Sequence, residues 1–192
     1  MTKVIKDENN CEKYCKVTDE QIMISVKQGS IDQAAILFER YHVGVYNYFL
    51  QANRDQSLSE DLTQNVFERM IKYRNSFKTD SRFKGWIFTI ARNVKMDHYR
   101  SQKIKMDEIT DQVDTALEDG EEGKMVALEN ATRLKKAIDM LEASYKEVLL
   151  LTRFEGLKYK EVAEILDCTE NTVKSKVRRA IIKLKTIYLQ IN

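Results

Sequence analysis

Apolar side chains recur every three or four positions along most of the chain, which predicts helices almost throughout. A short first helix is expected from Thr18, and helical spacing returns from Val126 with two further helices. The three longer N-terminal helices that we expect are 31–52, 57–75 and 82–101. The chain has no proline and only six glycines, a composition that favours helix. We therefore predict an all-α protein.

Polar residues predict where two of the long helices begin. Ser57 and Glu60 have the spacing of a capping box. The run Thr79-Asp80-Ser81 supplies turn and capping residues ahead of the third long helix.

The stretch 156–185 predicts two short helices joined by a tight turn. Small Ala163 lies where the second helix would cross the first closely. The apolar pattern stops at Asp167, a residue type that tolerates unusual backbone angles. Thr169 or Asn171 can then cap the next helix.

That second helix separates an apolar face from a basic one. Residues 169–185 contain six Lys or Arg and a single acidic residue, Glu170. We expect no acidic partners at i,i+4 spacing on the polar face, so the face is not simply solubilised by ion pairs. The apolar arc holds Val173, Val177, Ala180, Ile181, Leu184 and Tyr188. The opposite side holds Lys174, Ser175, Arg178 and Arg179. A basic helix after a short helix and a turn is typical of a helix-turn-helix that enters a DNA major groove; the alternative is a solvated surface helix.

The net charge of +2 conceals an uneven distribution along the 192 residues. Residues 1–103 carry a net charge of +4, residues 104–126 carry −6, and residues 127–192 carry +4. We therefore predict a polar extension (1–17), a helical domain (18–103), a flexible acidic linker (104–126) and a second helical domain of four helices (127–192). Because the linker offers little apolar area, we expect the two domains to fold independently and to move relative to each other.

Several classes of protein are disfavoured. No run of 18 apolar residues is present, so we expect no membrane span, and the polar N-terminus lacks a signal peptide, which predicts a cytoplasmic protein. Cys11, Cys15 and Cys168 are expected to be free thiols. The isolated His42 and His98 complete no zinc ligand set with the first two cysteines. Without a phosphate loop or nucleophile elbow, we expect no catalytic residue, metal or cofactor, and hence no enzyme.

The segment 57–75 carries apolar residues on both sides. Its core stripe is Leu62, Val66, Met70 and Tyr73, and opposite it lie Asp61, Gln64, Phe67, Glu68 and Ile71. Phe67 and Ile71 among carboxylates and an amide suggest a docking surface for another protein's helix. The alternative is a helix buried on both sides in its own bundle.

The segment 82–101 also has two distinct faces. Ile87, Ile90, Ala91 and Val94 point to one side, and Arg92, Asn93, Met96, Tyr99 and Arg100 point to the other. Arginine, asparagine and aromatic side chains beside the polar loop 78–82 suit single-stranded nucleic acid. Trp86 is favoured as a core residue, because tryptophan is mostly buried.

These residues resemble a known family. Asp61-Leu62-Thr63-Gln64 with Phe67, then Phe83-Lys84-Gly85-Trp86-Ile87 and Ile90-Ala91-Arg92-Asn93, resemble region two of an extracytoplasmic-function (ECF) sigma factor. Glu161-Val162-Ala163, Asn171-Thr172-Val173-Lys174-Ser175 and Arg179-Ala180 resemble its region four. The order, the spacing and the acidic linker agree with the family, and the resemblance covers residues 18–188.

The resemblance implies a bacterial sigma factor that binds core RNA polymerase and promoter DNA. Asp61, Gln64 and Phe67 match positions that bind the clamp helices of the largest polymerase subunit. The positions implied to melt and read the minus-ten element are Lys78, Arg82, Arg92, Asn93, Met96, Tyr99 and Arg100. Those implied at the minus-thirty-five element are Asn171, Thr172, Lys174, Ser175, Arg178 and Arg179. The family's typical regulator is a membrane-anchored anti-sigma factor, so such a partner is expected too.

Two departures from the family pattern and two rival classes remain. Glu142 follows Leu141 where proline is usual, and Asp167-Cys168 replaces the glycine usual in the turn.

The first rival is a helix-turn-helix regulator that does not associate with core polymerase. Such a regulator would need a sensor domain, and residues 18–102 show no strand alternation from which one could be built. The second is an anti-sigma or other protein-binding module, which leaves the basic face of the last helix unexplained.

Overall fold

The computed structural model describes residues 17–106 and 125–191, and the regular structure in these two ranges is helical. The N-terminal domain consists of α2 (Asp19–Lys27), a 3₁₀ turn η1 (Ile31–Gln33), α3 (Ala34–Asn53), α4 (Gln56–Lys72), a 3₁₀ turn η2 (Arg74–Ser76) and α5 (Phe83–Met106). The C-terminal domain consists of α6 (Met125–Asp139), α7 (Ala143–Leu149), a π-helical turn η3 (Leu150–Phe154), α8 (Tyr159–Leu166) and α9 (Glu170–Gln190). The all-α prediction is confirmed, and most of the predicted acidic linker lies outside the described residues.

The N-terminal domain is a bundle in which α3, α4 and α5 enclose an aromatic core. The rings of Tyr48 and Phe49 meet edge to face with centroids 5.5 Å apart, and Phe83 meets Tyr41 at 5.0 Å, the geometry that aromatic pairs prefer. The predicted inward face of α5 is confirmed, since its four residues are all buried: Ile87, Ile90, Ala91 and Val94. Trp86 is half-buried against this core.

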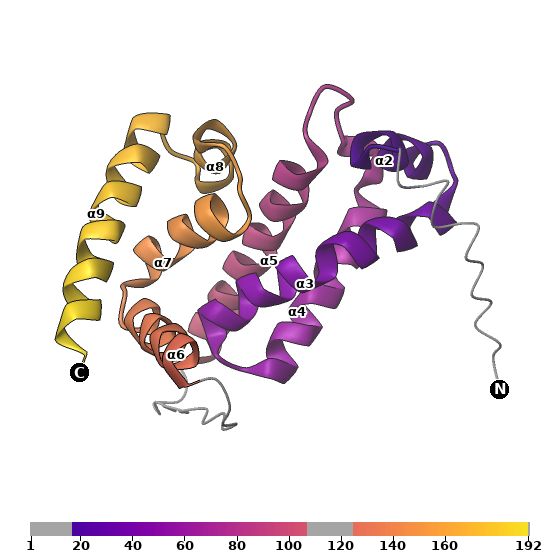
Figure 1. Ribbon diagram of the computed structural model, residues 1–192. Helices are drawn as coiled ribbons and strands as arrows, with labels where there is room; N and C mark the ends of the chain where they lie inside the picture. Colours follow the sequence, from indigo (N-terminus) through magenta and orange to yellow (C-terminus); the bar gives the residue numbers. More distant parts are fainter. Residues whose placement is uncertain (1–16, 107–124, 192) are drawn as a thin grey trace.

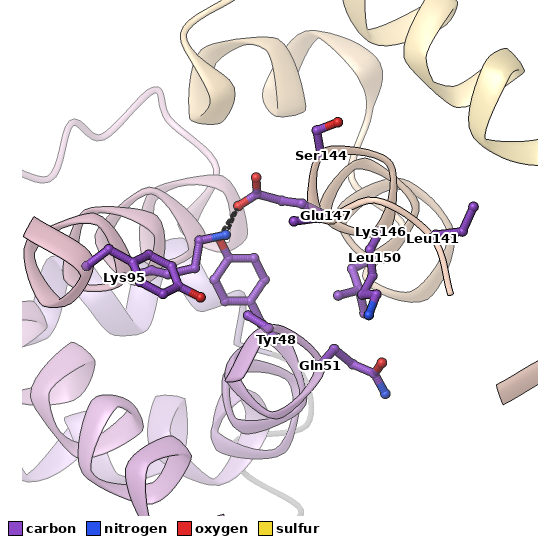
Figure 2. A pocket seen from close by; sticks show the side chains of 11 residues that line it. Tyr48, Gln51, Lys95, Leu141, Ser144, Lys146, Glu147 and Leu150 are labelled. Atoms are coloured by element: carbon purple, nitrogen blue, oxygen red, sulfur yellow. Dashed lines mark hydrogen bonds and ion pairs between the residues drawn. The ribbon is translucent and has the colours of Figure 1, made fainter. Parts of the chain in front are cut away.

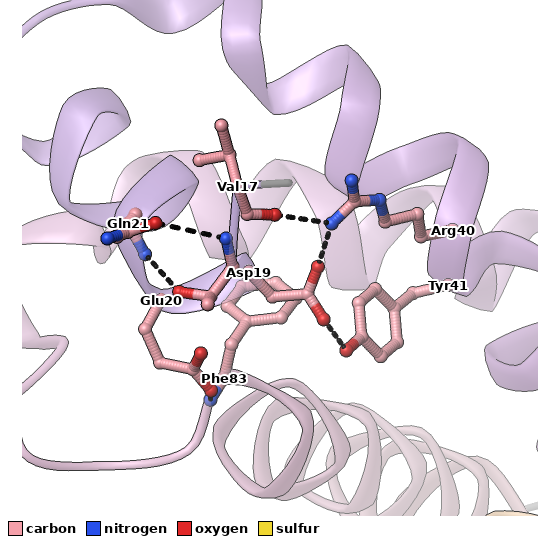
Figure 3. Close-up of polar contacts among 8 residues, drawn as sticks. Val17, Asp19, Glu20, Gln21, Arg40, Tyr41 and Phe83 are labelled. Carbon is pink, nitrogen blue, oxygen red and sulfur yellow. Dashed lines mark hydrogen bonds and ion pairs between the residues drawn. The ribbon is translucent and has the colours of Figure 1, made fainter. Parts of the chain in front are cut away.

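A polar network holds α2 against α3 at the edge of this bundle (Figure 3). The Asp19 carboxylate accepts hydrogen bonds from Arg40 and from the Tyr41 hydroxyl, and Arg40 also donates to the carbonyl of Val17 at 3.3 Å. Burial and the adjacent Asp19 carboxylate raise the pKa of Tyr41, so the phenol stays neutral. The start of the described chain is thereby fixed to the bundle.

The predicted helix starts need two corrections. α4 is capped by Asp55, whose carboxylate accepts from the Leu58 N–H at 3.0 Å, and Ser57 lies inside the helix. Asp55 has a more favourable position because it directly precedes the first helical residue. At α5, the Phe83 N–H donates to the Glu20 carboxylate of α2 at 3.1 Å. Glu20, far away in sequence, therefore supplies the hydrogen-bond acceptor that we expected from the turn 79–81.

In the C-terminal domain, α7 and α8 pack on α9 and form its core. Val173, Val177 and Ala180 of α9 are buried, as predicted. Between α7 and α8 the chain makes a π-helical turn, in which the Glu155 N–H donates to the Leu150 carbonyl five residues earlier at 2.9 Å. This widened turn directs the chain back toward the N-terminal domain.

The two domains are in direct contact. Figure 1 shows α5 between the remaining helices of its own domain and the α7–α8 side of the C-terminal domain. Buried residues of both domains join one continuous apolar cluster. The contact was not expected from the sequence, because it is made by helix faces and not by the linker; independent folding and relative movement of the two domains stay a prediction.

Candidate nucleic-acid and partner interfaces

The turn before α9 is built by two residues with distinct backbone roles. Asp167 ends α8 in the left-handed conformation, with φ 51° and ψ 55°. Thr169 then caps α9, its hydroxyl accepting from the Thr172 N–H at 3.2 Å. Both outcomes agree with the sequence prediction, and together they orient α9 across α8 as in a helix-turn-helix.

The outward face of α9 carries the predicted basic residues. Five of the six candidate groove residues are exposed: Asn171, Lys174, Ser175, Arg178 and Arg179. Thr172 is half-buried, and its hydroxyl lies 2.9 Å from that of Thr169. The helix can thus present amide, hydroxyl and guanidinium groups to base edges and phosphates.

Two expectations about α9 are wrong in detail. Lys174 has an acidic i,i+4 partner, with its ammonium 3.0 Å from the Glu170 carboxylate. Ile181, placed in the apolar arc, is 42% exposed, because at about 100° per residue it lies at the edge of that arc, about 80° from Val173. Lys183 pairs with Glu142 of the α6–α7 turn, so Arg178 and Arg179 dominate the accessible positive charge of this face.

The candidate docking face on α4 is divided. Asp61 and Gln64 are exposed as predicted. Phe67 is only 6% exposed, and its ring packs edge-on against Phe38 of α3 with centroids 4.8 Å apart. Tyr73, assigned to the core, is instead 49% exposed just beyond the helix end. More of the α4 surface is therefore buried than the sequence pattern predicted. Phe67 lies in the core beneath the candidate docking face and does not form part of its exposed surface.

The loop before α5 is anchored at its base. Phe77 is fully buried, and its carbonyl accepts from the Lys27 ammonium at 3.0 Å. Lys78 is exposed in the following turn. Arg82, at the end of the loop, is exposed but has its Nε 3.7 Å from a Glu161 carboxylate oxygen of α8. This loop can present cationic side chains while its backbone stays fixed.

The candidate nucleic-acid residues of α5 do not share one open face. Asn93, Met96 and Arg100 point to solvent. Arg92 instead points at the C-terminal domain and donates to the Leu166 carbonyl at 3.4 Å. Tyr99 lines a cavity at the domain boundary, and its hydroxyl donates to the Asn53 side-chain oxygen at 2.9 Å. Because α5 contacts two domains, its residues divide among three faces, whereas the sequence pattern distinguishes only two.

That cavity, of about 420 Å³, contains polar residues that the sequence did not single out (Figure 2). Glu147 of α7 accepts a hydrogen bond from the Tyr48 hydroxyl at 2.5 Å and pairs with the Lys95 ammonium, which lies over the Tyr48 ring. Burial, and next the Glu147 carboxylate, raise the pKa of Tyr48 and of Tyr99. No local motif marks these residues, because Tyr48 and Glu147 meet only when the two domains pack.

Another lysine of this cavity, Lys146, is buried, which disfavours its charged form. Desolvation lowers the pKa of Lys146, and this effect exceeds the opposing attraction of Asp139. Its ammonium donates to the Asp139 carbonyl at 3.3 Å. The lysine thus ties α7 to the end of α6 within the C-terminal domain.

Residues 17–106 and 125–191 contain no group of three or more histidine, cysteine or acidic side chains able to hold a metal. Cys168 is a free, half-buried thiol, while Cys11 and Cys15 lie outside the described residues. In the same two ranges no helix combines the length and apolarity needed to cross a membrane.

A bundle with an exposed acidic and amide face, joined to a basic helix-turn-helix, defines a two-domain DNA-binding protein with a partner surface. Comparisons with known proteins identify the family within this class. Residues 37–104 match the family model for sigma-70 region 2, and residues 131–184 match that for sigma-70, region 4.

Curated relatives and a solved structure agree with these matches. The chain is 31% identical to RNA polymerase sigma factor SigZ of Bacillus subtilis, over 79% of this chain and 84% of that protein. It is 29% identical to ECF RNA polymerase sigma factor SigM of the same organism, over 79% and 93%. Its fold matches the structure of CnrH in complex with the cytosolic domain of CnrY, with a TM-score of 0.68, 20% identity, and coverage of 91% and 99%.

The chain belongs to the ECF sigma factors, the subunits that bind RNA polymerase and direct it to promoters. Membership disfavours the rival reading of a helix-turn-helix regulator that does not associate with polymerase. The resemblance drawn from residues 18–188 is thereby confirmed.

Proposed function

We propose that this sigma factor docks on core RNA polymerase through α4, melts and reads the minus-ten element with the loop 78–82 and α5, and reads the minus-thirty-five element with α9. The observation that supports this most directly is the presence of both sigma regions in one chain, each with an outward polar face. Asp61 and Gln64 lie on one face, and Arg178 and Arg179 on the other. The polymerase supplies the catalysis, and no residue of this chain is assigned a catalytic role.

On α4, Asp61 and Gln64 contact the clamp helices of the largest polymerase subunit. Both are exposed, so a helix of the partner can reach them without rearrangement of the bundle. Phe67 contributes from below, because its burial against Phe38 sets the position of this surface.

At the minus-ten element, the exposed Asn93, Met96 and Arg100 of α5 form the accessible part of the interface, with Lys78 and Arg82 in the adjacent loop. An arginine can neutralise phosphate, and an asparagine amide can pair with the edge of an unstacked base. Arg92 and Tyr99 belong to the same interface, but in this structure Arg92 donates to the C-terminal domain and the Tyr99 hydroxyl donates to Asn53 of α3.

At the minus-thirty-five element, the exposed N-terminal half of α9 enters the major groove. Arg178 and Arg179 fork onto guanine or phosphate, and Ser175 and Asn171 read neighbouring edges. Lys174 adds charge near the phosphates once it leaves Glu170. We place the protein in the cytoplasm with the polymerase, and we include an anti-sigma factor among its partners.

Co-purification tests the central part of the proposal. A tagged full-length chain is expected to retain core RNA polymerase from a bacterial extract, and sequencing of DNA bound by the complex should reveal a shared promoter pattern. The double variant Asp61→Ala/Gln64→Ala should weaken polymerase binding by more than about 1 kcal/mol. The matched control removes an exposed carboxylate and amide from α3, as Glu39→Ala/Asn47→Ala. Equal retention of polymerase by both double variants would exclude α4 as the docking helix.

A further inference from the structure

Three cationic side chains along one side of α5 meet oxygens of the C-terminal domain. Lys84 lies 3.1 Å from a Glu155 carboxylate oxygen, and Lys95 pairs with Glu147. Between them, Arg92 donates to the Leu166 carbonyl at 3.4 Å. At about 100° per residue, these three cations fall within an arc of about 80° on the helix.

Arg82 adds a fourth contact at the N-terminal end of α5, 3.7 Å from a Glu161 carboxylate oxygen. The three glutamates come from the end of α7, the residue after the π-helical turn, and the first turn of α8. Their side chains are only 15–19% exposed, although each is ionisable and lies at the domain boundary. These acids form one surface, the acidic seam (Glu147, Glu155 and Glu161).

The acidic seam lies against the backbone of the N-terminal domain at two glycines, and the contact at Gly44 is the tighter one. A Cβ atom at Gly44 of α3 would lie 3.1 Å from both Glu155 carboxylate oxygens. A Cβ atom at Gly85 of α5 would lie 3.9 Å from the Cβ of Glu161. The fit therefore involves backbone as well as side chains, which distinguishes the seam from an incidental set of surface ion pairs.

We propose that the acidic seam occupies the side of α5 where DNA phosphates would bind, so that the C-terminal domain competes internally with the promoter strand. Carboxylate and phosphate oxygens offer the same acceptors to arginine and lysine. This inference rests on the proposed role of α5 at the minus-ten element. It adds that Lys84 and Lys95 belong to the DNA surface, and that Arg92 reaches DNA only after the seam opens.

The competition affects α5 but not α9, because the basic face of α9 points away from the seam. Arg178 and Arg179 remain exposed in the closed arrangement. The closed chain can thus meet duplex DNA through α9 while the side of α5 that carries Lys84, Arg92 and Lys95 stays covered. Of the four contacts, only that of Arg82 has an exposed cation and is weak for that reason. A polyanion can open the seam by offering phosphate oxygens to several of these cations at once.

A reversible disulfide tests this proposal in the full-length chain. In a background with Cys11, Cys15 and Cys168 changed to serine, Gly85→Cys/Glu161→Cys places two thiols across the seam. The Cβ separation of 3.9 Å lies within the range that disulfides occupy. Oxidation should lock the domains together, and reduction of the same sample should release them.

The probes are a fluorescent 20-nucleotide single strand of random sequence and a random duplex, since binding through charge and stacking tolerates any sequence. Locking should weaken single-strand binding by about tenfold or more, as expected when several phosphate contacts are lost. Duplex binding should change by less than about twofold, because α9 stays open. Equal single-strand affinity in both redox states would overturn the internal competition and leave the proposed function intact. Absence of single-strand binding in the reduced state as well would remove α5 from the nucleic-acid surface, and with it both proposals.

A second set of variants tests the carboxylates themselves. Glu147→Gln/Glu155→Gln/Glu161→Gln keeps side-chain size while removing three charges from the seam. The control Asp32→Asn/Glu39→Gln/Glu60→Gln removes three charges from exposed positions elsewhere. Single-strand affinity should rise about tenfold in the seam variant and by less than about threefold in the control. Equal increases in both variants would mean that net charge alone is responsible, and would refute the seam as a phosphate substitute.

Discussion

The Tyr48 hydroxyl donates a hydrogen bond to the Glu147 carboxylate at 2.5 Å, joining residues 99 positions apart and two different domains. The same carboxylate also binds Lys95, so one glutamate of α7 receives a phenol and an ammonium from the N-terminal bundle. In the C-terminal domain alone, this glutamate would be solvated. Its burial therefore depends on contact between the domains. The contribution of this contact to stability can be measured with variants of either Tyr48 or Glu147.

Tyr48→Phe should reduce the free energy of unfolding by about 0.5–1.5 kcal/mol, because Glu147 loses a buried donor while the ring is retained. Urea unfolding of Tyr48→Phe, Glu147→Gln and the double variant gives the coupling energy of the pair. A coupling energy near zero would mean that the two side chains do not interact in solution.

The same tyrosine predicts a dependence on alkaline pH. Burial and Glu147 raise the pKa of Tyr48 above its ordinary value of 10.0. The stability that this group contributes is thus fully present below about pH 10 and is lost as pH rises through the folded-state pKa. Wild-type stability should therefore fall more steeply above about pH 10 than that of Tyr48→Phe, as followed by urea unfolding across this range. Because Tyr41 and Tyr99 titrate in both proteins, the difference between them reports on Tyr48.

Phe67→Ala should destabilise the N-terminal domain by about 3–5 kcal/mol, since it removes a buried ring and leaves a cavity beside Phe38. This reverses the expectation, from the pattern of α4 alone, that the side chain serves docking. Gln64→Ala is the matched surface variant: it should change stability by less than about 0.5 kcal/mol. Thermal unfolding and polymerase pull-down on the folded fraction separate the two effects. A Phe67→Ala variant as stable as Gln64→Ala would show that the ring is not part of the core.

Asp167 is expected to tolerate glycine but not a β-branched residue. The residue has φ 51° at the end of α8, a region open to glycine and strained for valine. Asp167→Val should cost about 1–2 kcal/mol and weaken duplex binding by α9, whereas Asp167→Gly should leave both unchanged. Thermal melting and duplex titration provide the comparison. Equal effects of valine and glycine would assign the role to the Asp167 side chain and not to the backbone conformation.

On α9, arginine and lysine variants should separate base reading from charge. Arg178→Ala and Arg179→Ala should each relax preference at particular upstream base pairs by about 1–3 kcal/mol. Lys183→Ala should weaken all sequences alike and reduce the salt dependence, because Lys183 lies at the flank of α9, where its ammonium can leave Glu142 for a phosphate. Holoenzyme binding to single-base promoter variants measures both quantities. Equal, sequence-independent losses for Arg178→Ala and Lys183→Ala would contradict base reading by this face.

What the sequence predicted well depends on local, repeated patterns. The inward residues of α5, the capping by Thr169 and the left-handed Asp167 all follow from spacing or residue type within a few positions. The start of α4 was misplaced because the capping-box spacing of Ser57 and Glu60 was preferred, whereas Asp55, two residues earlier, caps the helix.

The sequence could not predict which side chains of α5 contact the C-terminal domain. Helical periodicity divides a helix into a buried and an open side, so it placed Arg92 and Tyr99 with Asn93. In the structure, the C-terminal domain takes up part of that open side. Lys95 and Glu147 are 52 positions apart and carry no common motif, which is why the seam could not be found from local patterns.

The π-helical turn Leu150–Phe154 lies between two acids of the seam, Glu147 and Glu155. Its hydrogen bond from Glu155 to Leu150 spans five residues instead of the usual four. Removing one residue here would restore ordinary helical spacing and rotate everything beyond the deletion by about 100° relative to α7. The two carboxylates could then no longer face α5 together. The length of this short turn therefore sets the angle between Glu147 and Glu155, and deletion of one of its uncharged residues would disrupt the seam without altering a charge.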